Sequence, residues 1–304
     1  MLCCTGRPQQ TYQLACINML DHSAPPVPPL REFLPKQFGH TFAPVGLCIY
    51  CGTDQYLSDE HIIPLGLGGR FILPKASCRT CSRITSEFER TCLRRMYGPL
   101  RLLYELPSRR VNDRPETLNL KVKWTPEAEW TYVPVPADRY PFLVTFPYFG
   151  MPGALTGNVP ETASGPVTSR LWIRGASPEH DFMQLLAALT KDLGVYAVMP
   201  ESVAEIPAFC RLLAKIAHAY AIAEFGYSNV RSDLSPFIVA GALDHCLHHI
   251  GSAAKDDSPT DELHEMDVRE RLRDSLLVVK IRLLAKLGTP TYYVVVGSRT
   301  PNAS

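Results

Sequence analysis

The alternation of apolar and polar residues predicts β-strands in the second half of the chain. Leu118, Leu120 and Val122 alternate with polar asparagine and lysine residues, a pattern typical of a strand with one buried face. Apolar runs predict further strands at 130–133, 142–146, 171–173, 276–284 and 292–296. The last two are expected to form an antiparallel pair packed on helices, because only a short turn separates them.

Apolar residues at helical spacing predict several helices. The apolar residues of the first helix lie four positions apart: Ile84, Phe88, Cys92 and Met96. This helix is expected over 79–97, with Gly98 as its C-cap. Further helices are expected at 177–193, 207–225 and 236–250. The last one carries His245 and His249 at metal-ligand spacing, but we interpret them as a solvated polar face, because no metalloprotease motif accompanies them.

The composition is that of a globular protein, since 46% of the 304 residues are hydrophobic and 20% are charged. The mixture of strand and helix patterns predicts the α+β class. No apolar run reaches the roughly 18–20 residues of a membrane span, and no secretory leader pattern is visible. We therefore expect a cytoplasmic protein with no membrane partner.

Two C-x-x-C pairs flank one short segment of the chain. Cys48 and Cys51 form the first pair, and Cys78 and Cys81 form the second. Two intervening residues let both thiolates reach one tetrahedral zinc ion, and two such pairs are a zinc pattern. Two redox pairs, or unpaired core cysteines, are the alternatives. Zinc is the favoured interpretation, because both pairs border the same small unit.

The residues between these pairs predict a hairpin. A strand is expected over 57–63 and ends at Pro64, and a second strand over 71–73 ends at Pro74, with a glycine-rich loop between them. The helix expected at 79–97 follows directly. The sequence therefore predicts a ββα unit built around a metal.

This stretch resembles the HNH endonucleases (His-Me finger) in the branch held by four cysteines. The residues Glu60-His61-Ile62-Ile63-Pro64 resemble the first motif of that family, and Cys78-x-x-Cys81 followed by a helix resembles its last motif. The resemblance covers residues 45–98, and the rest of the chain has a weaker similarity to the longer bacterial HNH proteins. It implies a DNA-cleaving enzyme with a structural Zn²⁺ and a catalytic Mg²⁺ or Mn²⁺.

The resemblance also implies a role for three residues. His61 corresponds to the general base that activates water, and Glu60 corresponds to the ligand of the catalytic divalent metal. Ser82 stands where the family has a metal-binding His or Asn, and no Asn occurs between Arg70 and Leu73, where the family has one. Glu89, two helical turns beyond Ser82, is either a compensating carboxylate or an ordinary solvated residue.

The net charge of +1 hides a basic segment. Residues 70–110 hold ten Lys or Arg and three Glu, which gives +7, so the remaining residues carry −6. Four arginines of this segment fall on one face of the predicted helix: Arg79, Arg83, Arg90 and Arg94. An arginine row beside a metal site is typical of contact with a phosphate backbone.

These observations predict a flexible Pro-rich tail over 1–40, an HNH-like ββα-metal domain over 41–105 and a larger α+β domain of unknown function over 106–304. The favoured function is metal-dependent hydrolysis of phosphodiester bonds, with double-stranded DNA as the expected partner. Two alternatives stay open: an HNH-derived zinc unit that binds nucleic acid without cutting, and a zinc-stapled scaffold for protein interactions.

Overall fold

The computed structural model describes residues 39–108, 114–157, 170–176, 182–241, 246–253 and 258–300. Residues 1–38 of the expected tail, and His245 of the helix expected at 236–250, lie outside these ranges.

A small three-stranded sheet and a helix form the N-terminal ββα unit, by which we mean residues 39–103. In this sheet β3 is central, with β1 parallel on one side and β2 antiparallel on the other. Its elements are β1 (His40–Thr41), β2 (Leu57–His61), β3 (Phe71–Cys78), α2 (Arg79–Thr91), a π-helical turn (Cys92–Met96) and α3 (Gly98–Leu103). The predicted hairpin and helix are both present.

Three predicted ends inside this unit are wrong. The first strand, β2, ends at His61 and not at Ile63. Pro74 does not end the second strand, because β3 bulges opposite Asp59 and so tolerates a residue without an N–H group. The Asp59 carboxylate accepts the backbone N–H of Lys75 in the bulge, at 3.3 Å. Gly98 does not cap α2 either, because the chain continues through the π-helical turn and Gly98 begins α3.

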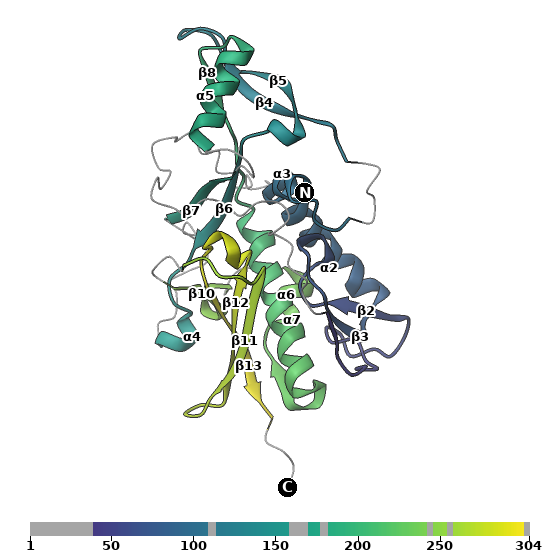
Figure 1. The fold of residues 1–304 in the computed structure, drawn as a ribbon. Coiled ribbons are helices and arrows are strands. Elements are labelled where there is room, and N and C mark those ends of the chain that lie inside the picture. The colour runs from purple at the N-terminus through teal and green to yellow at the C-terminus, as the bar shows by residue number, and fades with distance from the viewer. Residues whose placement is uncertain are drawn as a thin grey trace, which may run out of the picture.

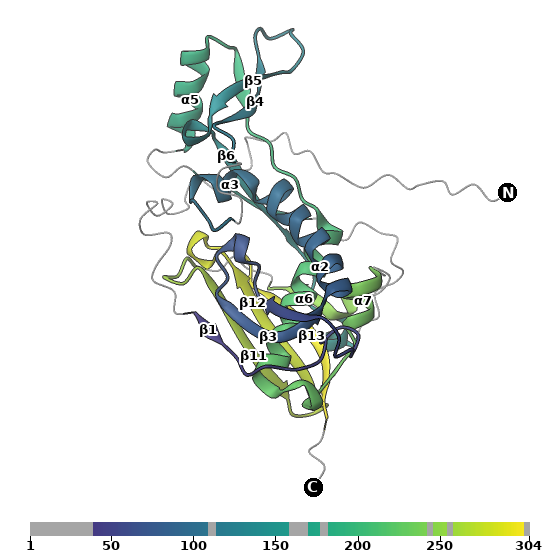
Figure 2. The ribbon, with the colours of Figure 1, turned by 90° about the vertical axis from the view of Figure 1, so that its right-hand side faces the viewer.

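The long helix α6 (Ile206–Phe225) lies at the centre of the molecule, between the ββα unit and the C-terminal sheet (Figures 1 and 2). It is the one helix among the described residues that is long and apolar enough to cross a membrane. However, 78% of its apolar window is buried inside the protein, as in the core helix of a folded domain. Its predicted bounds, 207–225, are confirmed.

The C-terminal sheet packs against α6 from the other side. Its strand order is β10-β13-β12-β11, and β9 pairs with the far end of β13. The strands are β9 (Val230–Ser232), β10 (Ile250–Ser252), β11 (His264–Arg271), β12 (Leu276–Leu283) and β13 (Tyr292–Arg299). The predicted antiparallel pair of β12 and β13 is confirmed.

Sequence patterns missed β9, β10 and β11, because two of these strands have three residues each and β11 is mostly charged. The single helix predicted over 236–250 is wrong. Gly241 adopts a left-handed conformation and ends α7 (Ser235–Ala240), and α8 (Cys246–His249) is a separate short helix.

A smaller group of elements lies at the opposite end of the molecule from α7 and the far ends of β11 and β13 (Figure 1). There α5 (Phe182–Leu193) lies beside a three-stranded sheet, and a two-stranded sheet leads back toward α6. The strands are β4 (Thr117–Lys123), β5 (Thr131–Pro136), β8 (Ala197–Met199), β6 (Phe142–Tyr148) and β7 (Arg170–Ala176), with the short α4 (Gly153–Thr156) following β6.

The protein is of the α+β class, as predicted. One continuous core of buried residues runs from Cys48 in the ββα unit through α6 to Val296 in β13. The boundary expected between 105 and 106 stays a prediction, but the buried side chains on its two sides pack together.

Candidate functional site

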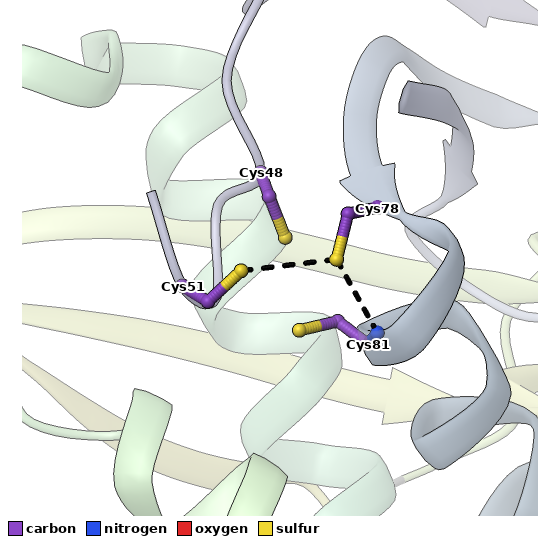
Figure 3. A group of neighbouring side chains, drawn as sticks. All are labelled: Cys48, Cys51, Cys78 and Cys81. Carbon is purple, nitrogen blue, oxygen red and sulfur yellow. Dashed lines mark hydrogen bonds between the residues drawn. The ribbon is translucent and has the colours of Figure 1, made fainter. Parts of the chain in front are cut away.

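The four cysteines of the two C-x-x-C pairs converge on one point. Cys48 and Cys51 lie in the loop before β2, Cys78 ends β3 and Cys81 lies in the first turn of α2. Their sulfur atoms all lie within 4.8 Å of one another, and the Sγ atoms of Cys51 and Cys78 are 3.7 Å apart (Figure 3). A tetrahedral Zn²⁺ with Zn–S bonds of about 2.3 Å places its sulfurs about 3.8 Å apart.

The donor set therefore fits a structural zinc ion with four thiolate ligands, and the prediction of four residues around one site is confirmed. Backbone hydrogen bonds hold the first pair in place, from Cys48 N–H to the Thr53 carbonyl at 2.7 Å and from Ile49 N–H to the Ala76 carbonyl at 2.8 Å. Three of the cysteines are buried and Cys51 is exposed. A single cluster of four sulfurs does not match the alternative of two separate redox pairs.

The β2–β3 hairpin buries the Glu60 side chain, and hydrogen bonds hold the loop that follows the Glu60–Pro64 motif. Glu60 pairs with Leu73 of β3 and is only 6% exposed. Behind the motif, Leu67 N–H and Gly69 N–H both donate to the Pro64 carbonyl. A Cβ atom on Gly69 would overlap the Ile63 carbonyl oxygen, so the chain comes this close only because position 69 is glycine.

The Glu60 carboxylate binds the ammonium of Lys215, which comes from the middle of α6. Oε1 of Glu60 lies 2.6 Å from Nζ of Lys215, and Oε1 of Glu89 in α2 lies 2.9 Å from the same Nζ. Nζ also donates to the His61 carbonyl and, at 3.2 Å, to the Ile62 carbonyl. Glu89 thus joins Glu60 as the sequence allowed, and we call these two residues the acidic pair.

Burial sets the electrostatics of this cluster. The Lys215 side chain is 0% exposed, and those of Glu60 and Glu89 are 7% and 19% exposed. Burial alone would lower the pKa of Lys215, but the two carboxylates outweigh it, so the pKa is raised above its ordinary value. Burial first, and then Glu60 and Glu89, raise the pKa of Tyr50 well above its ordinary range, so this phenol stays protonated.

Two other residues were predicted to be catalytic, His61 and Ser82. His61 ends β2 and is half-buried, and its backbone carbonyl accepts a hydrogen bond from the Lys215 ammonium. Ser82 lies in the first turn of α2 beside the cysteines, and its carbonyl accepts the Thr85 hydroxyl at 3.1 Å. The catalytic roles of His61, Glu60 and Ser82 stay predictions.

The four arginines predicted to share a helix face are all exposed: Arg79, Arg83, Arg90 and Arg94. We call them the arginine face. Other basic residues of the same segment serve the fold. Arg95 is paired with Glu205 at 2.9 Å, and Arg101 donates to the Gly66 carbonyl at 2.7 Å and to the Leu93 carbonyl at 3.2 Å.

Sequence reasoning missed Lys215 entirely and gave His218 no partner. His218 is buried, and its Nε2 lies 2.7 Å from the Ile49 carbonyl, while its ring stacks on Tyr50. One signal was available for Lys215. A lysine in the middle of an apolar helix that is buried on all sides needs an anionic partner, because a buried charge without one is strongly unfavourable.

The family model described as HNH endonuclease matches residues 48–96. The matched segment contains both cysteine pairs, the β2–β3 hairpin and α2, so the resemblance drawn from these motifs is confirmed. No curated protein and no solved structure matches the chain. The ββα unit is therefore similar to HNH endonucleases over residues 48–96, and its cysteine cluster fits a zinc ion.

Proposed function

We propose that the ββα unit binds nucleic acid, with the sugar-phosphate backbone lying along the arginine face. The observation that carries this proposal is the exposure of all four arginines: Arg79, Arg83 and Arg90 on α2, which begins at the cysteine cluster, and Arg94 on the π-helical turn that continues α2. Arginine makes bidentate contacts to phosphate, and a row of such contacts binds without reading base sequence. Double-stranded DNA is the form that we propose, in keeping with the HNH family match.

Salt dependence tests this proposal. Binding of a labelled DNA duplex is measured by fluorescence anisotropy at several salt concentrations, without added divalent metal. Each phosphate contact contributes about 0.9 to the slope of log affinity against log salt, so replacing all four arginines by alanine should remove a slope of about 3 to 4. The matched control replaces two exposed arginines of the C-terminal hairpin, Arg269 and Arg273, by alanine.

Equal losses in the arginine-face variant and in the control would reject this surface. A protein with no salt-sensitive affinity for DNA or RNA would instead support the scaffold alternative.

Phosphodiester hydrolysis is the second candidate function, and the family match favours it. In this candidate His61 is the general base, as imidazole titrates near neutral pH, and Glu60, with Ser82 or water, would hold a Mg²⁺ or Mn²⁺ ion. A plasmid-nicking assay with Mg²⁺, Mn²⁺ and Ni²⁺ tests it, with His61→Ala as the variant and the zinc content measured for each protein. Nicking that disappears both in EDTA and in His61→Ala supports hydrolysis, whereas tight binding without nicking supports the first proposal.

A further inference from the structure

We infer that the cation of the acidic pair is the ammonium of Lys215, and that this ammonium takes the place of the divalent metal ion that an HNH site would hold. The inference concerns the same ββα unit as the proposed function and rests on it only for its consequence for nucleic acid. It starts from a disagreement: the side chains present fit zinc at the cysteines but do not fit a second metal at Glu60.

The oxygen atoms around Nζ of Lys215 are those that a hard divalent cation prefers. They are one carboxylate oxygen each from Glu60 and Glu89 and the backbone carbonyl oxygens of His61 and Ile62. All four come from the ββα unit, whereas the ammonium comes from α6. The second part of the chain thus inserts a positive charge into an oxygen cage that the HNH segment builds.

A metal ion has no room beside this ammonium. The Lys215 side chain is fully buried, and the three N–H groups of its ammonium donate to four surrounding oxygen atoms. A divalent ion at the acidic pair would face the ammonium at close range, and the repulsion would be strong in so dry a place. Moving the ammonium away would leave it among the neighbouring buried side chains of α6, such as Leu212 and Ile216, without a partner.

The position of α6 is itself fixed against the ββα unit. One turn beyond Lys215, the His218 ring binds the Ile49 carbonyl at 2.7 Å, and its Nδ1 lies 2.8 Å from the Ser232 hydroxyl of β9. Two side chains of one helix therefore bind carbonyl groups of the ββα unit, His218 at Ile49 inside the first cysteine pair and Lys215 at the end of β2. With α6 anchored in this way, Lys215 is a permanent part of the site.

The consequence is that Glu60 and Glu89 are compensated from within the chain. A single positive charge replaces a double one, and no open coordination position faces a phosphate. In this protein the ββα unit then holds nucleic acid without cutting it through a metal at Glu60.

Manganese binding tests the inference in the full-length, zinc-loaded protein. Mn²⁺ is titrated into wild type and Glu60→Gln and followed by electron paramagnetic resonance, with zinc content as the check on folding. We expect the two proteins to give the same Mn²⁺ binding, since the carboxylate of Glu60 is not open to metal. A Mn²⁺ ion that wild type binds and Glu60→Gln loses, at unchanged zinc content, would overturn the inference.

A second variant, Lys215→Ala, should create a Mn²⁺ site that the wild type lacks. Lys215→Ala removes the ammonium and leaves a space between the two carboxylates, so it should bind one Mn²⁺ per chain, and the double variant Lys215→Ala/Glu60→Gln should not. Lys121→Ala, which breaks the partly exposed pair with Glu201, is the matched control and should bind no additional Mn²⁺. A folded Lys215→Ala protein without the additional ion would also overturn the inference.

If Lys215→Ala does not fold, the comparison of wild type with Glu60→Gln decides alone. The outcome is separate from that of the proposed function, because DNA binding is measured without divalent metal. If Mn²⁺ binding overturns the inference while salt-dependent DNA binding is intact, the arginine-face proposal still stands. If the protein does not bind DNA, the Mn²⁺ titration can still be interpreted.

Discussion

Nε2 of His218 lies 2.7 Å from the carbonyl oxygen of Ile49, and this hydrogen bond joins the core helix α6 to the first cysteine pair. Ile49 stands between Cys48 and Tyr50, and its own N–H group donates to Ala76 of β3. The metal-binding loop is therefore held on one side by the small sheet and on the other by α6. Substitutions in α6 should thus change the stability of the ββα unit.

Replacing Lys215 by methionine should strongly destabilise the protein. The substitution keeps a long unbranched side chain but leaves two buried carboxylates without a cation, a loss of about 3–5 kcal/mol in the free energy of unfolding. Urea denaturation measures it, and Lys215→Met/Glu60→Gln should recover part of the loss. The control Lys121→Met should lose less than about 1 kcal/mol, because its pair with Glu201 is partly exposed. Equal losses would contradict a buried charge cluster.

Removing one cysteine ligand should release the zinc ion. Cys78→Ser replaces a thiolate at the junction of β3 and α2, so the purified protein should contain well under one zinc per chain and its ββα unit should become sensitive to proteolysis. Cys92→Ala is the control, since Cys92 is a buried cysteine of the same unit outside the cluster. Atomic absorption gives the zinc content, and a full zinc complement in Cys78→Ser would contradict the four-thiolate site.

Stability should fall with pH in the range set by His264. Burial lowers the pKa of His264 from 6.5 to about 4, although the hydrogen bond from Nε2 to the Leu67 carbonyl, at 2.8 Å, partly opposes this shift. Nδ1 accepts the Leu284 N–H at 3.2 Å. A base with a lowered folded-state pKa binds protons more readily when unfolded. Its contribution is therefore complete above pH 6.5 and is lost as the pH falls toward 4.

We expect this loss to be about 2 kcal/mol, less than the full linkage value, because the residue keeps some contact with solvent. Urea midpoints at pH 7.0, 5.5 and 4.5 measure it. The pH dependence should be weaker in His264→Gln and unchanged in His40→Gln, at an exposed position. The same slope in His264→Gln as in wild type would assign the effect to other groups.

An alanine at position 69 should destabilise the loop behind the Glu60–Pro64 motif. The new Cβ would overlap the backbone of Ile63, which cannot move aside as a flexible side chain can, and overpacking of this kind costs about 1–3 kcal/mol. Gly150→Ala is the control, because a Cβ there meets nothing within 4 Å and the substitution should change stability by less than about 0.5 kcal/mol. Thermal denaturation of both variants makes the comparison.

Local patterns were sufficient for much of the fold and for half of the site. The C-x-x-C spacing placed four thiols around one point, and periodicity found α6, β4 and the β12–β13 pair. The patterns failed where proline or glycine, which usually ends an element, lies inside a longer one. Pro74 lies in a bulge of β3, where its missing N–H group is tolerated, and Gly98 begins α3 instead of capping α2.

The sequence by itself determined the metal-binding staple and the order of hairpin and helix, since two residues between cysteines fix what one ion can reach. The tertiary structure alone decided what the Glu60 carboxylate binds. Its partner, Lys215, belongs to a distant apolar helix whose pattern specifies burial but not the groups that it faces. A buried ion pair of this kind depends on how separate elements pack, and no local spacing in the chain encodes that packing.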